Sequence, residues 1–150
     1  MRERARVKGF LNVRLVDRKT GRVVEEKRIP NTLDGEFAIG VCGELAGEEN
    51  VLLGKLDEVK LTDPNGNEIK RISPPSVLER RSYTDHEEVY AKWEDRSTDS
   101  YTVDAAAIKA KYTIDTTTYD RWIAYTSTGG VSKAADQVLV VEWTIAVYYG

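Results

Sequence analysis

The last residues of the chain form its most apolar and most β-prone stretch, QVLVVEWTIAVYY at 137–149. Successive side chains of a strand point to opposite faces. One face therefore carries Leu139, Val141, Trp143, Ile145, Val147 and Tyr149, and the other carries Val138, Val140, Glu142, Thr144, Ala146 and Tyr148. An edge strand with one solvated side does not require two apolar faces. We therefore expect this strand at the centre of a sheet, with its second face covered by another sheet or another subunit.

Polar turns separate the other strand-like segments. Residues 10–29 and 56–72 each have the pattern of a β-hairpin, with the turns DRKTG and DPNGN. Further strand patterns cover 88–95, 101–114 and 120–126, without helical patterns between them. This spacing predicts an all-β fold, an antiparallel β-sandwich of jelly-roll type with about eight strands.

One segment near residues 34–47 has helical periodicity. Phe37, Val41 and Leu45 recur every four residues, after Asp34 as a candidate N-cap and before a glycine at the C-terminal end. We predict one short helix here, with the single cysteine, Cys42, on its buried face.

The segment YTVDAAAIKAKYTI changes the phase of its apolar alternation. Odd positions are apolar up to Ala105 and even positions from Ala106 onward. This slip predicts a β-bulge near these two residues.

The chain is long enough for one domain with one substantial core. We divide its 150 residues into a basic N-terminal arm, 1–9, and a single β-sandwich domain, 10–150. Residues 1–30 hold ten Lys or Arg against four Asp or Glu, a balance of +6, which leaves −9 for the rest. Such an arm can meet an acidic neighbouring subunit, nucleic acid or solvent alone. We consider nucleic acid an unlikely partner.

The cysteine count and the hydropathy of the chain indicate the cellular compartment in which it folds. A single cysteine excludes an intrachain disulfide, no apolar run reaches the length of about 20 residues that spans a bilayer, and no signal-peptide pattern follows the first residues. We expect a chain folded in a cytosol, or a particle assembled there, without membrane contact. Abundant Glu, Lys and Arg with one Gln and one Met weakly indicate a thermophilic source.

Patterns for catalysis or metal binding are incomplete. The only histidine, His86, lies among acidic residues without a nucleophile-elbow sequence. The stretch DPNGNE at 63–68 lacks the glycine and the final glutamate of a calcium loop, so a hairpin turn explains it better. We expect no enzyme activity, no cofactor and no metal. Three tryptophans, Trp93, Trp122 and Trp143, would suit a sugar-stacking platform, but their strand patterns favour core positions or subunit contacts.

Two segments together resemble structural proteins of tailed phages and related prokaryotic viruses, of the tail-fibre, tail and head-decoration types. The first is TGRVVEEKRIPNTLDGEFAIGVCGELAG, in which the likeness lies in Asn31, Gly35, Leu45, Ala46 and Gly47. The second consists of KWEDRSTDSYTV and VSKAADQVLVVEWTI, with the matching residues Tyr101, Thr102, Lys133, Asp136, Trp143, Thr144 and Ile145. The charged LDEVKLTDPNGN and the run DAAAIKAK depart from that pattern.

This resemblance implies a virion structural protein, a capsid decoration or turret protein or a tail component. Such a protein acts through β-rich contacts with copies of itself, a trimer being favoured, and with other virion proteins, after assembly in the host cytoplasm. The candidate subunit contacts are Arg2, Arg4, Arg6, Lys8, Trp143, Tyr148 and Tyr149. The alternative function is a carbohydrate-binding or surface-appendage module of the same β-sandwich architecture.

Overall fold

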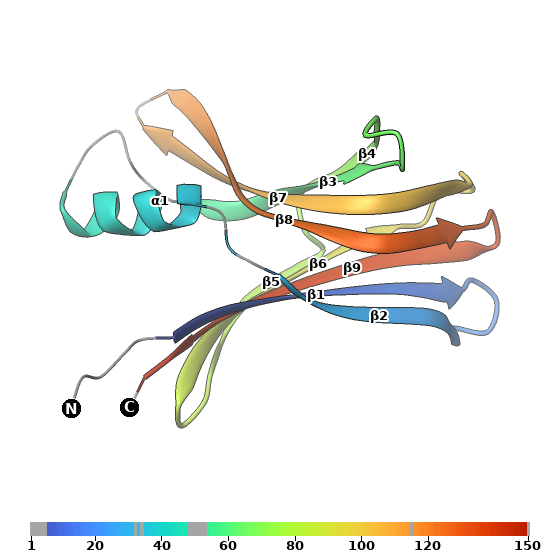
Figure 1. Ribbon diagram of the computed structural model, residues 1–150, viewed down its shortest axis with the longest axis horizontal. Coiled ribbons are helices and arrows are strands. Elements are labelled where there is room, and N and C mark those ends of the chain that lie inside the picture. The colour runs from blue at the N-terminus through green and yellow to red at the C-terminus, as the bar shows by residue number, and fades with distance from the viewer. Residues whose placement is uncertain (1–5, 32, 34, 48–53, 115, 150) are drawn as a thin grey trace.

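Two antiparallel β-sheets pack face to face and form a sandwich (Figure 1). The computed structural model describes residues 6–31, 33, 35–47, 54–114 and 116–149. The five-stranded sheet has the order β2 (Val23–Asn31), β1 (Arg6–Asp17), β9 (Gln137–Tyr148), β6 (His86–Asp95) and β5 (Val77–Ser82). The four-stranded sheet has the order β4 (Glu68–Ile72), β3 (Lys55–Thr62), β7 (Tyr101–Ile114) and β8 (Thr117–Lys133). One helix, α1 (Gly35–Leu45), follows β2.

The C-terminal strand β9 is the central strand of its sheet, which confirms the prediction from its two apolar faces. It pairs with β1 on one side and with β6 on the other. On the inner face Leu139, Val141 and Trp143 are fully buried against the second sheet. The other face lies on the outside of the sandwich, and no other described element covers it (Figure 1). Val140 is nevertheless buried there, since long side chains of the neighbouring strands flank it.

Trp93 and Trp143 are the largest fully buried side chains of the core between the sheets. The indole Nε1 of Trp93 donates a hydrogen bond to the backbone oxygen of Asp57 at 3.2 Å. This oxygen is available because the pairing of β3 with β7 is irregular between Leu56 and Glu58. The irregularity satisfies a buried donor that an apolar core would otherwise leave unpaired.

The predicted irregularity in β7 is confirmed. Its pairing with β8 shifts between Val103 and Ala105, where Ser127 and Val131 are the partners on β8. Val103 faces the core before the shift, and Ala106 and Ile108 face it afterwards. The change of phase in the sequence therefore coincides with this register shift, at which two residue steps of β7 lie opposite four of β8.

The predicted helix is confirmed, but the expected burial of Cys42 is wrong. Helix α1 turns Gly40 and Gly43 toward the protein, where a backbone without side chains can approach closely. At 100° per residue, Cys42 and Leu45 lie about 160° and about 140° away from Gly40 around the helix. Cys42 is accordingly exposed rather than buried, and Leu45 is 85% exposed.

The strand count and the path of the chain differ from the sequence prediction in detail. Nine strands lie in the described residues, because Val77–Ser82 forms an edge strand that the sequence did not indicate. The jelly-roll topology is not confirmed. Each of the pairs β1–β2, β3–β4, β5–β6 and β7–β8 is a hairpin whose two strands belong to the same sheet. Strand β1 begins at Arg6, so residues 6–9 belong to the sheet rather than to an arm.

We expect Trp143→Ala to lower the free energy of unfolding by about 3–5 kcal/mol, because it leaves a large cavity in the core. The matched control is Tyr125→Ala at a position that is 62% exposed, where a change within about 0.5 kcal/mol is expected. Urea denaturation followed by circular dichroism measures both. Equal losses for the two variants would contradict the position of Trp143 in the core.

Candidate functional site

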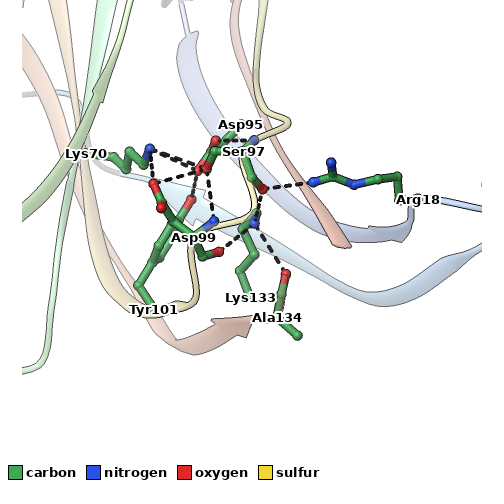
Figure 2. Close-up of polar contacts among 8 residues, drawn as sticks. All are labelled: Arg18, Lys70, Asp95, Ser97, Asp99, Tyr101, Lys133 and Ala134. Carbon is green, nitrogen blue, oxygen red and sulfur yellow. Dashed lines mark hydrogen bonds and ion pairs between the residues drawn. The ribbon is translucent and has the colours of Figure 1, made fainter. Parts of the chain in front are cut away.

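A cluster of polar side chains closes one end of the sandwich, where the loop after β6 leads into β7 (Figure 2). The ammonium group of Lys133 is its centre, and this residue is 2% exposed. Its Nζ donates hydrogen bonds to the backbone oxygens of Ser97 at 2.7 Å, Asp99 at 2.7 Å and Ala134 at 3.3 Å. Burial lowers the pKa of Lys133. The three carbonyl groups compensate for the lost hydration of the charge.

The carboxylate of Asp95 holds the other half of this cluster. It accepts hydrogen bonds from the hydroxyl of Tyr101 and from the backbone N–H of Ser97. Lys70 reaches across from the second sheet, with Nζ 3.8 Å from Asp95 and 2.7 Å from the carboxylate of Asp99. Burial alone would raise the pKa of Asp95, but these hydrogen bonds and the charge of Lys70 outweigh it and lower that pKa.

Burial and the bond to Asp95 raise the pKa of Tyr101, so its hydroxyl stays a donor. Each charged or hydroxyl group of the cluster is thus engaged with another part of the same cluster. The cluster ties strands of both sheets to the loop at 96–100, and we assign it a structural role. The residues Tyr101 and Lys133, which belong to the resemblance described above, face each other in register on β7 and β8.

We expect Lys133→Met to destabilise the fold by about 1–3 kcal/mol, because the backbone oxygen of Asp99 loses its Nζ donor and that of Ser97 is left with Arg18 as its donor. Lys19→Met, in the exposed turn after β1, is the control and should change stability by less than about 0.5 kcal/mol. Urea denaturation measures the difference. A Lys133→Met variant as stable as the control would show that the ammonium group does not hold this loop.

The opposite end of the sandwich is open and apolar. Helix α1, the start of β1, the end of β9 and the β5–β6 hairpin lie together at this end (Figure 1). A cleft of about 460 Å³ enters between the two sheets here. Its apolar lining comes from both sheets and from the helix, and consists of Phe37, Leu56, Leu78, Val89, Ala110, Ile123, Ile145 and Val147.

Exposed apolar side chains gather around this cleft. Of the twelve large apolar side chains that are exposed in the described residues, eight lie at this end, which we call the open end. They are Val7, Ile39, Leu45, Leu78, Tyr83, Val89, Val147 and Tyr149. Three of them, Leu78, Val89 and Val147, project from the inner face of the five-stranded sheet and line the cleft. A patch of this kind on a folded protein indicates an interaction surface.

The imidazole of His86 joins the β5–β6 hairpin to the end of β9. Its ring stacks between those of Tyr83 and Tyr148, with centroid distances of 4.4 Å and 4.5 Å. Nδ1 lies 2.7 Å from the carboxylate of Asp85, and Nε2 lies 3.0 Å from that of Glu88. The bonds to Asp85 and then Glu88 raise the pKa of His86. The protonated ring donates from both nitrogens, which suits two acceptors that cannot donate.

The raised pKa of His86 predicts a pH dependence of stability. The contacts of the protonated imidazole add to the free energy of unfolding. This contribution is fully present below the unfolded-state pKa of about 6.5, and it is lost as the pH rises through the higher pKa of the folded state. We therefore expect the stability advantage of the native chain over His86→Gln to shrink as the pH rises from the unfolded-state pKa of about 6.5 into the alkaline range. Urea denaturation across this range measures it, and an advantage that is constant with pH would contradict the two carboxylate contacts.

The predicted subunit contacts lie in different parts of the structure. Arg2 and Arg4 lie outside the described residues, and Arg6 pairs through its backbone with Tyr148 of β9. Lys8 is exposed, with its Nζ 5.4 Å from the ring centre of Tyr148. The prediction that Trp143 is a subunit contact is wrong, because this side chain is fully buried in the core of its own subunit.

Tyr149 is the candidate contact with the most accessible ring. It is 52% exposed, and its hydroxyl donates to the backbone oxygen of Tyr83 at 3.0 Å. The exposed apolar residues that sequence reasoning missed are those of the cleft and of α1. The cleft joins residues from distant strands, and no local pattern marks such a site.

A second hollow lies on the outer face of the five-stranded sheet. This groove of about 340 Å³ crosses the middle of the sheet and is lined by Phe10, Leu11, Asn12, Arg28, Arg81, Glu88, Tyr90, Glu142 and Thr144. Glu142 forms its floor, within reach of Asn12, Arg14 and Tyr90. Polar groups that converge in a hollow are the usual means of orienting a ligand.

The described ranges contain no metal-binding cluster and no membrane-spanning helix. No three His, Cys, Asp or Glu side chains there come together in a way that would hold a metal ion. The turn at Asp63 is a hairpin turn in which the Asp63 carboxylate accepts the backbone N–H groups of Asn65 and Asn67. Helix α1, the one helix of the described part, is too short to cross a bilayer.

Comparison of the chain with protein-family models, with curated proteins and with solved structures finds no match.

Proposed function

We propose that this chain is a structural subunit of a virion, a capsid decoration or turret protein or a tail component, that assembles with copies of itself through the open end. The observation that supports the proposal is the gathering of eight of the twelve exposed large apolar side chains of the described residues at that end. Burial of such side chains between subunits provides the main favourable free energy of association.

The charges around the open end suit a contact between identical surfaces. Lys8, Lys55 and Arg80 carry positive charge there, and Asp85 and Glu87 carry negative charge. A surface that carries both positive and negative charges can complement a copy of itself when symmetry places the positive charges of one copy opposite the negative charges of the other. Oligomers of identical chains are predominantly symmetric, and the resemblance to virion proteins favours a trimer.

The setting in a virion rests on the resemblance of two segments of the sequence to phage structural proteins. A subunit of this kind acts through its β-rich surfaces, as the open end would. In this proposal the basic residues of the N-terminal arm, Arg2 and Arg4 among them, pair with an acidic patch of an adjoining chain or of another virion protein. Assembly that weakens with salt would accompany such a contact.

The three tryptophans do not share one exposed surface, as a carbohydrate-binding platform built on them would require. Trp93 and Trp143 are fully buried in the core. Trp122 lies on the outer face of the four-stranded sheet, but the ammonium groups of Lys60 and Lys109 lie 4.7 Å and 4.6 Å from its ring centre. A sugar ring would have to displace both cations in order to stack there.

We expect sedimentation equilibrium of the purified chain to show a stable oligomer of defined size. The variant Leu45→Lys with Val89→Lys places two charges on the exposed apolar surface, and should weaken association by at least about tenfold because each charge loses hydration in the interface. The control is Val24→Lys, at a position that is also exposed but lies on β2, away from the open end.

Circular dichroism and thermal melting establish that both variants fold. A native chain that remains monomeric at all concentrations would refute the proposal. An oligomer that forms equally well in both variants would show that a different surface holds the subunits together.

A further inference from the structure

Helix α1 carries an exposed apolar stripe on the side that faces away from its own chain. The helix lies at the open end with Gly40 turned toward the protein (Figure 1). The stripe consists of Ala38, Ile39, Cys42 and Leu45, all of which are exposed. At 100° per residue these four positions fall within about 120° of the helix circumference, opposite Gly40. Apolar residues at such a spacing are the pattern by which an amphipathic helix binds in an apolar groove.

The cleft of the open end is an apolar hollow of about 460 Å³ beside the same helix. Phe37 of α1 forms part of its wall, and this residue lies outside the apolar stripe, about 80° or more around the helix from each stripe residue. A helix cannot turn opposite sides toward one cleft. The apolar stripe of a chain therefore cannot fill the cleft of that chain, and each of the two surfaces needs a partner from elsewhere.

The charges of the cleft and of the helix are complementary. Arg80 projects into the cleft, because it pairs with Val89, whose partner on β9, Ile145, belongs to the core. Arg80 and Lys55 line the cleft, are exposed and have no ion-pair partner among the described residues. The helix has the sequence GEFAIGVCGEL, with two glutamates and no basic residue, and its C-terminal end adds a partial negative charge.

The acidic residues around the cleft are engaged within the chain. Glu79 and Glu88 alternate to the outer face of the sheet, where Glu79 pairs with Arg81 and Glu88 lies 3.0 Å from Nε2 of His86. Glu87 shares the inner face with Arg80, and its carboxylate accepts a serine hydroxyl of β5 at 2.8 Å. The charges that stay available at the cleft are therefore mainly positive.

We infer that α1 of one copy docks, by its apolar stripe, in the cleft of a second copy. This inference rests on the proposed assembly through the open end and specifies which two surfaces meet there. A small apolar ligand in the cleft would leave Leu45, which is 85% exposed, in solvent. A second copy covers the cleft and the stripe together. Since the two surfaces differ, the contact is head-to-tail, and it closes when copies form a ring, such as the proposed trimer.

Disulfide cross-linking tests this contact, because the chain has a single cysteine, Cys42, and it lies on the apolar stripe. Two separate variants, Leu78→Cys and Arg80→Cys, place a second cysteine at the cleft. After mild oxidation we expect covalent dimers or larger species from at least one of them on non-reducing electrophoresis. The yield should exceed that of the control by at least about tenfold, because a disulfide requires Cα atoms within about 7 Å of each other.

The matched control is Val24→Cys, at an exposed position on β2 away from the open end. Addition of Cys42→Ser to the reactive variant should remove the product, and oxidation of the native chain measures any bond between two copies of Cys42. Sedimentation equilibrium without oxidant establishes which variants assemble.

The outcomes separate this inference from the proposed function. Assembly without a cross-link from either cleft position, or a cross-link that persists after Cys42→Ser, would overturn the docking of the helix and leave assembly through the open end intact. A chain that stays monomeric would overturn both. An apolar small molecule found at one equivalent in an organic extract of the purified protein would also overturn the docking, because the cleft would then hold a ligand in place of a helix.

Discussion

The pairing of β9 with β1 and β6 is the interaction on which the rest of the structure depends. This strand pairs along its entire length with β1, from Arg6 opposite Tyr148 to Asp17 opposite Gln137, and with β6 from His86 to Asp95. It therefore joins the first hairpin of the chain to the β5–β6 hairpin, and it supplies Trp143 to the core. A segment at the end of the sequence is thus an interior element of the fold.

The two ends of the sandwich differ in chemistry, and the proposed assembly depends on this difference. At one end Lys133 and Asp95 hold the loop between the sheets with hydrogen bonds and ion pairs within the chain. At the other end the inner face of the five-stranded sheet continues past the core, and Val89 and Val147 line a cleft. Apolar surface of this kind is stabilised by a partner rather than by solvent.

Features with a local pattern could be predicted from the sequence, and features that depend on distant residues could not. The central position of β9, the two hairpins, the helix and the phase slip in β7 follow from alternation and turn residues. Strand β5 was missed because VLERRS follows a proline pair and lacks alternation, and its pairing is dictated by β6. The burial of Trp143 and the exposure of Cys42 depend on which face the tertiary structure covers, which periodicity alone does not define.

Glu142 and Thr144 are the two polar residues that interrupt the apolar alternation of β9, and both line the groove on the outer face. A charged residue at the centre of a sheet loses hydration, and sequences retain it where its partners are provided. Here the partners are Asn12 and Tyr90, which the register with β1 and β6 places on either side of Glu142 and its neighbour Thr144. The interruption of the apolar pattern thus identifies the position of the polar network before the fold is known, whereas its partners become apparent only from the pairing of the strands.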